Sequence, residues 1–96
     1  MHQKILNEMR TRVRAGQLAM TPHALDELYA DGLTIDDLRR CILNGQIVER
    51  QFVDFFAEYK YVIEGETETD DELIHVVAKL GKRNTVVITT YRVAQH

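Results

Sequence analysis

The sequence predicts an α+β fold with three N-terminal helices packed on one face of a curved, mainly antiparallel four-stranded sheet. As far as Asn44, apolar residues recur every three or four positions, which is the period of an amphipathic helix. From Ile47 onward, β-branched and aromatic residues gather in short runs, which is typical of strands. Helices followed by a run of strands predict two segregated layers.

Length and composition predict a single domain over residues 1–96. The chain has 96 residues, 45% of them hydrophobic, which is enough for one core and too few for two. Its apolar runs are far shorter than the roughly 20 residues of a membrane helix, and residues 1–4 do not lead into a signal-peptide core. We therefore expect a cytoplasmic protein with no membrane association.

The first helix is expected from about Gln3 to Ala15. Its apolar residues recur at helical spacing and predict the buried stripe: Ile5, Leu6, Met9 and Val13. Gly16 follows and ends the helix. The same segment holds one acidic residue and four basic ones, Lys4, Arg10, Arg12 and Arg14. The helix therefore offers either a basic docking face or an ordinary solvated surface.

The second helix is expected to begin at Pro22 and to place a histidine among free backbone N–H groups. Thr21 is a good N-cap and Pro22 suits the first helical position, so His23 lies in the first turn. The helix dipole is expected to favour the neutral imidazole there, which makes His23 a candidate general base. The same N–H groups suit a phosphate. The alternative is a capping or surface histidine.

Capping signals bound the second and third helices. Asp31-Gly32 ends the second helix. Thr34 opens the third, with Asp37 in the position of the acid of a capping box, and Asn44-Gly45 closes it with a glycine expected in the left-handed conformation. The apolar sides are expected to hold Leu25, Leu28 and Tyr29, and then Ile35, Leu38, Cys41 and Ile42.

Cys41 is the only cysteine of the chain. A single cysteine excludes an internal disulfide and a cysteine zinc site, and its place in an apolar helical pattern predicts a small buried hydrophobe. The chain also has no serine, which excludes a serine nucleophile. We expect no metal and no other cofactor.

Four strands are expected after the third helix: Ile47–Arg50, Tyr59–Glu64, Leu73–Lys79 and Thr85–Val93. The short connections predict antiparallel hairpins, with Gly81–Asn84 as a tight turn and Gly65–Glu72 as an acidic loop. Alternation along the third of these strands places His75 and Lys79 on one face. It places Ile74 and Val76 on the other face, which is expected to be the core.

The face that carries His75 is the candidate site. We expect Lys60 and Arg50 to share it, with Tyr59 and Tyr61 on the opposite side. In the last strand, alternation leaves open whether Tyr91 or Arg92 joins His75.

These residue types fit a metal-independent ribonuclease, which needs a base for the 2′-hydroxyl, an acid for the leaving oxygen and cations around the phosphate. The candidate catalytic residues are His23, His75, Tyr91 and Arg92. The candidate substrate-binding residues are Lys60, Lys79 and Arg83. For His75 the alternative is a sheet histidine that is hydrogen-bonded to its neighbours.

The charge distribution favours a second hypothesis, a non-catalytic protein-binding module that uses its sheet or its basic first helix. The net charge of −3 argues against a generic nucleic-acid coat. Residues 64–72 hold six acidic residues and no basic one, whereas the rest of the chain holds 12 basic and 9 acidic residues.

A set of short motifs is spread over residues 20–93: His23-Ala24, Leu33-Thr34, Asn44-Gly45, Val48-Glu49, Lys60-Tyr61, His75-Val76-Val77 and Thr89-Thr90-Tyr91. In order and spacing these motifs resemble a bacterial and archaeal family known as domain of unknown function four-two-five-eight. Many members are similar to RelE, ParE and MqsR toxins in length and order of elements. The resemblance therefore implies a RelE-toxin-like fold and an mRNA endonuclease that is held inactive by an antitoxin-like protein partner.

The sequence departs from the family beside His23. Many members carry basic residues where this chain has Glu27 and Asp31. Because carboxylates repel a phosphate backbone, these acids disfavour RNA binding next to His23. Exposed edges of the expected sheet are compatible with either a monomer or a homodimer.

Overall fold

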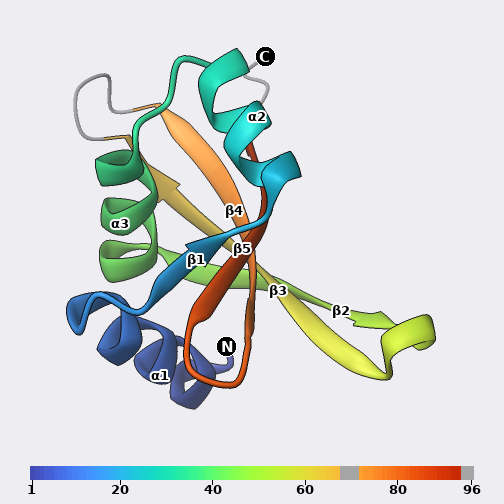
Figure 1. The fold of residues 1–96 in the computed structure, drawn as a ribbon. Helices are drawn as coiled ribbons and strands as arrows, with labels where there is room; N and C mark the ends of the chain where they lie inside the picture. The colour runs from blue at the N-terminus through green and yellow to red at the C-terminus, as the bar shows by residue number, and fades with distance from the viewer. Residues whose placement is uncertain (68–71, 94–96) are drawn as a thin grey trace.

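The computed structural model describes residues 1–67 and 72–93 and confirms the α+β class (Figure 1). The described part of the chain contains, in order, α1 (Gln3–Arg14), β1 (Leu18–Met20), α2 (Pro22–Ala30), α3 (Ile35–Asn44), β2 (Gln46–Val53), the 3₁₀ turn η1 (Asp54–Phe56), β3 (Glu58–Glu66), β4 (Leu73–Leu80) and β5 (Thr85–Arg92). Of the expected acidic loop, residues 68–71 lie outside the described residues.

The sheet has five strands in the order β1-β5-β4-β3-β2, so the prediction of four strands is wrong. Strands β2 to β5 form the expected antiparallel meander. The additional strand is Leu18–Met20, which pairs in parallel with Thr85–Val87. Three residues between two helices are too few to show a strand period, and their partner lies at the other end of the chain.

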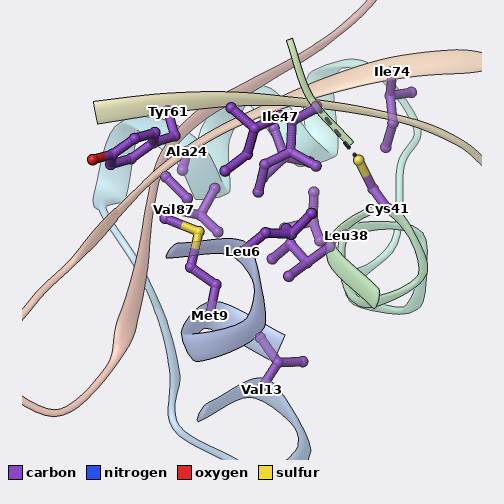
Figure 2. Packing of buried hydrophobic residues seen from close by; sticks show 14 of the residues in the cluster. Leu6, Met9, Val13, Ala24, Leu38, Cys41, Ile47, Tyr61, Ile74 and Val87 are labelled. Carbon is purple, nitrogen blue, oxygen red and sulfur yellow. Dashed lines mark hydrogen bonds between the residues drawn. The ribbon is translucent and has the colours of Figure 1, made fainter. Parts of the chain in front are cut away.

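The core lies between the three helices and one face of the sheet, which we call the covered face (Figure 2). The helices contribute Leu6, Met9, Val13, Ala24, Leu28, Leu38, Cys41 and Ile42, and the sheet contributes Ile47, Tyr61, Ile63, Ile74, Val76, Ala78 and Val87. Leu25 and Tyr29, expected on the apolar side of α2, are 37% and 71% exposed. Ile35, expected on the buried side of α3, is 50% exposed. Both helices are short and contact the core along one narrow stripe.

Both predicted N-caps are present. Thr21 Oγ1 accepts a hydrogen bond from the N–H of Ala24 at 3.1 Å and donates one to the carbonyl of Ile88 at 2.9 Å, which fixes the start of α2 against β5. Thr34 and Asp37 form the reciprocal capping box of α3, with hydrogen bonds of 3.1 and 2.9 Å.

Gly45 ends α3 in a different way from the one expected. Its φ of −84° is not left-handed, so the prediction of a left-handed glycine is wrong. Glycine is required there because a Cβ would lie closer than 3.0 Å to the backbone oxygens of Glu64 and Cys41. The residue allows β3 to pass directly against the end of the helix.

Two of the basic side chains of α1 hold the fold together. Arg10 donates hydrogen bonds to the carbonyls of Ile42 and Gly45 at 2.9 and 2.7 Å. Arg12 donates to the carbonyls of Gly81 and Asn84 at 2.8 and 2.9 Å. Half of the basic cluster is therefore used to bind carbonyl groups at a helix end and a turn, and Lys4 and Arg14 remain exposed.

Candidate functional site

The face of the sheet opposite the helices, which we call the open face, carries a row of three polar side chains from adjacent strands. The strand register pairs Glu64 of β3 with His75 of β4, and His75 with Tyr91 of β5. Cross-strand neighbours point to the same face. Because Ile74 and Val76 point into the core, His75 and its two neighbours point away from it.

Hydrogen bonds join the three side chains of this row. His75 Nε2 lies 2.9 Å from Glu64 Oε2, and His75 Nδ1 lies 3.1 Å from the hydroxyl oxygen of Tyr91. An ionised carboxylate only accepts, so in the neutral imidazole Nε2 carries the hydrogen and Nδ1 accepts from the Tyr91 hydroxyl. The His75 and Tyr91 rings also meet edge to face, with centroids 5.3 Å apart.

A bulge in β5 decides that Tyr91, and not Arg92, joins His75. The pairing with β4 runs from Thr89 directly to Val87, so Ile88 is an extra residue without a partner in that ladder. The bulge shifts the in-and-out alternation of side chains by one position. Val87 before it and Thr90 after it are both fully buried, although they are three residues apart. Tyr91 therefore turns to the open face.

Arg92 points to the covered side. Its Nε donates to the Asp31 carbonyl at the end of α2, at 3.1 Å, and its guanidinium pairs with the Glu72 carboxylate. These contacts tie β5 to α2 and to the start of β4. Arg92 is therefore separated from His75, and of the two residues that alternation left open, Tyr91 is the one that shares its face.

His23 also lies apart from the row. It occupies the first turn of α2, as predicted, and is exposed. The helix packs on the covered side through Ala24 and Leu28, whereas His75 lies on the open face. The structure therefore does not bring the two histidines together.

The predicted cations are distributed unequally. Lys79 and Lys60 share the open face with His75; Lys79 Nζ lies 2.8 Å from Glu58 Oε1, and Lys60 forms no ion pair within the described residues. Arg83 lies in the exposed turn between β4 and β5. Arg50, also expected on this face, lies on the other, because it pairs with Tyr61. Its guanidinium carbon is 4.3 Å from the centroid of the Tyr59 ring.

Glu64 is the member of the row that sequence reasoning did not select. Glu64 is the last residue of the expected strand Tyr59–Glu64 and the first of the acidic residues 64–72, and it stands two positions after Val62 and four after Lys60. This alternation along the strand was the available signal. Its pairing with His75 requires the register of β3 on β4, which depends on the fold.

Cys41 is outside the row, and the structure confirms that it is buried. Its Sγ–H donates to the carbonyl of Ile63 at 3.6 Å (Figure 2). Burial, with a smaller contribution from the charge of Glu64, raises the pKa of the thiol to about 12. Among residues 1–67 and 72–93, no group of three or more His, Cys, Asp or Glu side chains is arranged to hold a metal ion.

A groove of about 410 Å³ adjoins the Glu64 end of the row. It runs between the end of α3 and the start of β2, and its lining includes Arg40, Val48 and Glu66. A second groove of about 280 Å³ lies on the α1 side and shares Gly45 and Gln46 with the first.

A family model described as domain of unknown function (DUF4258) matches residues 20–92, which confirms the resemblance noted in the sequence. The matched segment includes α2, α3 and strands β2 to β5, and with them Glu64, His75 and Tyr91. No curated protein and no solved structure matches the chain. Within the described residues, no helix is long and apolar enough to cross a membrane.

Proposed function

We propose that this chain, which belongs to the DUF4258 family, is a cytoplasmic metal-independent ribonuclease and the toxin-like component of a toxin–antitoxin pair. The observation that carries the proposal is the hydrogen-bonded row of Glu64, His75 and Tyr91 on the open face. In this proposal the fold is RelE-toxin-like, and an antitoxin-like protein covers the open face.

The row supplies the base for cleavage. As the 2′-oxygen of the ribose attacks phosphorus, its proton passes to the Tyr91 oxygen while the Tyr91 proton passes to His75 Nδ1. Glu64, which accepts the Nε2–H, stabilises the imidazolium that forms. The bond from phosphorus to the 5′-oxygen breaks, and water protonates that oxygen. The hydroxide that remains takes a proton from Tyr91, and His75 returns its proton to Tyr91. The products are a 2′,3′-cyclic phosphate and a 5′-hydroxyl.

Accessibility suits this order of transfer. Tyr91 is 41% exposed, whereas the His75 side chain is 19% exposed. The phenol is therefore the end of the row that a substrate can reach. Lys60, Lys79 and Arg83 are assigned to the phosphate groups. Lys79 is paired with Glu58, whereas Lys60 and Arg83 have no ion pair to break within the described residues.

The test is cleavage of RNA by the purified chain in the presence of a metal chelator. His75→Ala and Tyr91→Phe are expected to lower the rate by about a hundredfold to ten-thousandfold, because each removes a step of proton transfer. Tyr59→Phe is the matched control, since Tyr59 is 43% exposed and lies on the other side of the sheet. His23→Ala is expected to retain cleavage.

The second test follows the growth and the RNA of bacterial cells in which expression of the chain is induced. Growth arrest with fragmented RNA, relieved by His75→Ala, supports the toxin-like assignment. Intact RNA and normal growth would reject it, and so would cleavage that survives both substitutions in the row.

The second candidate function is the non-catalytic protein-binding module. It is favoured by exposed aromatic side chains on the hairpin of β2 and β3, which are 43% to 89% exposed. The basic first helix is a weaker candidate surface, because Arg10 and Arg12 are bound to backbone carbonyls.

A further inference from the structure

The hairpin of β2 and β3 projects beyond the rest of the sheet (Figure 1). It carries exposed aromatic side chains. We call residues 49–59 the arm. Its aromatic side chains are Phe52, Phe55, Phe56 and Tyr59, which are 51%, 89%, 66% and 43% exposed. Single exposed apolar residues are ordinary, but a group of aromatics on one projecting element is typical of an interaction surface.

The arm also forms the long edge of the sheet. β2 is the last strand in the order, so its outer backbone groups have no strand partner within the described residues. The opposite edge is β1, which has only three residues. A long aromatic edge strand is a template for pairing with another chain, and natural proteins cover such edges.

We propose that a second copy of this chain covers β2, pairing antiparallel about Gln51 to form a two-fold symmetric dimer. In this register Arg50 lies opposite the other copy's Phe52, and Glu49 lies opposite the other copy's Val53, so no like charges face each other. A slip of the pairing to centre on Arg50 would place two guanidinium groups opposite each other. The helices of both copies then lie on the same side of one continuous sheet.

The same register brings the arm to the two grooves. Residues that follow Gln51 lie beside residues that precede it in the other copy as far as Val53, where β2 ends. The 3₁₀ turn that follows, with Phe55 and Phe56, extends toward the start of the other copy's β2. Gln46 there lines the grooves of about 410 and 280 Å³, and Ile47 lines the smaller one. Each copy thus offers both the exposed rings and a hollow that accepts them, which is the self-complementarity of a two-fold interface.

Charge disfavours a nucleic acid as the occupant. The larger groove has no net positive charge, since Glu64 and Glu66 line it beside Arg40. In the arm, acidic side chains also outnumber basic ones, which disfavours a nucleic acid on it. The inference is independent of the proposed ribonuclease activity.

The first test is the mass of the full chain in solution. Sedimentation equilibrium at about 10–100 µM is expected to give a dimer. Phe55→Ala combined with Phe56→Ala is expected to weaken dimerisation by at least about tenfold, because aromatic anchors dominate such interfaces. Tyr29→Ala, which removes a 71% exposed aromatic from α2, is the matched control. Circular dichroism verifies that the variants fold.

The second test is a cross-link at the two-fold axis. Gln51→Cys is expected to form a disulfide-linked dimer under mild oxidation, since a residue on the axis faces itself in the other copy. Lys60→Cys, on the neighbouring strand opposite Gln51, is expected to stay unlinked. A monomer at all concentrations overturns the proposal. A dimer that is indifferent to the arm substitutions, or that does not link through position 51, overturns it as well.

Discussion

Polar side chains on the covered and open faces of the sheet differ in burial and in their hydrogen-bond partners. On the covered face, Thr85 and Thr90 are fully buried and each donates to a backbone carbonyl, of Met9 and His75 respectively. On the open face, polar side chains bond to one another and stay partly exposed. Neighbouring residues of one strand, such as Thr90 and Tyr91, therefore lie in the core and on the open face in turn, so substitutions one position apart should differ in their effect on stability.

The largest expected contrast concerns Cys41 on the covered side. Because its thiol is fully buried, a thiol reagent reaches it only when the protein opens, so labelling of the folded chain should be at least about a thousandfold slower than in denaturant. The rate of reaction with an aromatic disulfide reagent, measured with and without urea, checks this. Labelling at the rate of a free thiol would show that the covered face is accessible.

The Cys41 thiol also makes the stability of the folded chain depend on pH in the alkaline range. Its pKa is raised to about 12 from an ordinary value of 9.0, so the unfolded chain releases this proton at a lower pH than the folded chain. The folded state then binds more protons, and the contribution to stability is lost as pH rises from about 9 toward 12. Urea unfolding at a series of pH values should show a shallower alkaline loss in Cys41→Ala than in the unsubstituted chain.

Two leucine-sized residues of α3 test the direction of its buried stripe. Leu38→Ala is expected to lower the free energy of unfolding by about 2–5 kcal/mol, because Leu38 is fully buried and a cavity remains. Ile35→Ala, at a residue that is 50% exposed, is expected to change it by less than about 1 kcal/mol. Urea midpoints at unchanged slope give both values. Equal losses would contradict the observed orientation of the helix.

Gly45 and Gly32 are needed for two different reasons, a close backbone contact and a left-handed backbone conformation. Gly45→Ala is expected to cost about 1–3 kcal/mol, because its Cβ would collide with backbone oxygens of Glu64 and Cys41. Gly32→Ala meets nothing within 4 Å but has a φ of +66°, so its cost is about 1 kcal/mol of conformational strain. Thermal or urea unfolding of the pair measures the difference. A harmless Gly45→Ala would mean that α3 and β3 can move apart.

Thr21 joins the covered face to the bulge that turns Tyr91 outward. Thr21→Ala is expected to cost about 1 kcal/mol through loss of the cap, together with the hydrogen bond to the Ile88 carbonyl. Thr21→Ser keeps the hydroxyl and should retain most of the stability. Chemical-shift changes at Tyr91 in the alanine variant, and not in the serine variant, would confirm the link to the bulge.

The smallest effect on folding is expected on the open face. The partly exposed pairing of His75 with Glu64 is worth about 1 kcal/mol or less, so His75→Gln should change the urea midpoint little even where RNA cleavage is lost. A loss as large as that of Leu38→Ala would show that the row is structural, and would count against its role as a site.

The sequence determined the elements that depend on neighbours in the chain. The caps at Thr21 and Thr34 and the face that carries His75 follow from hydrogen bonds and periodicities that span a few residues. Those signals were sufficient for the helix bounds and for the α+β class. They also placed His75 and Lys79 on the face opposite the core.

The tertiary structure decided what depends on residues far apart. The pairing of β1 with β5, the bulge at Ile88 and the partnership of Glu64 with His75 each join segments that are distant in the sequence. A bulge reverses every later side chain of a strand without leaving a periodic signature. For that reason alternation alone did not choose between Tyr91 and Arg92, and the sheet register assembled a row of which only two members had been selected.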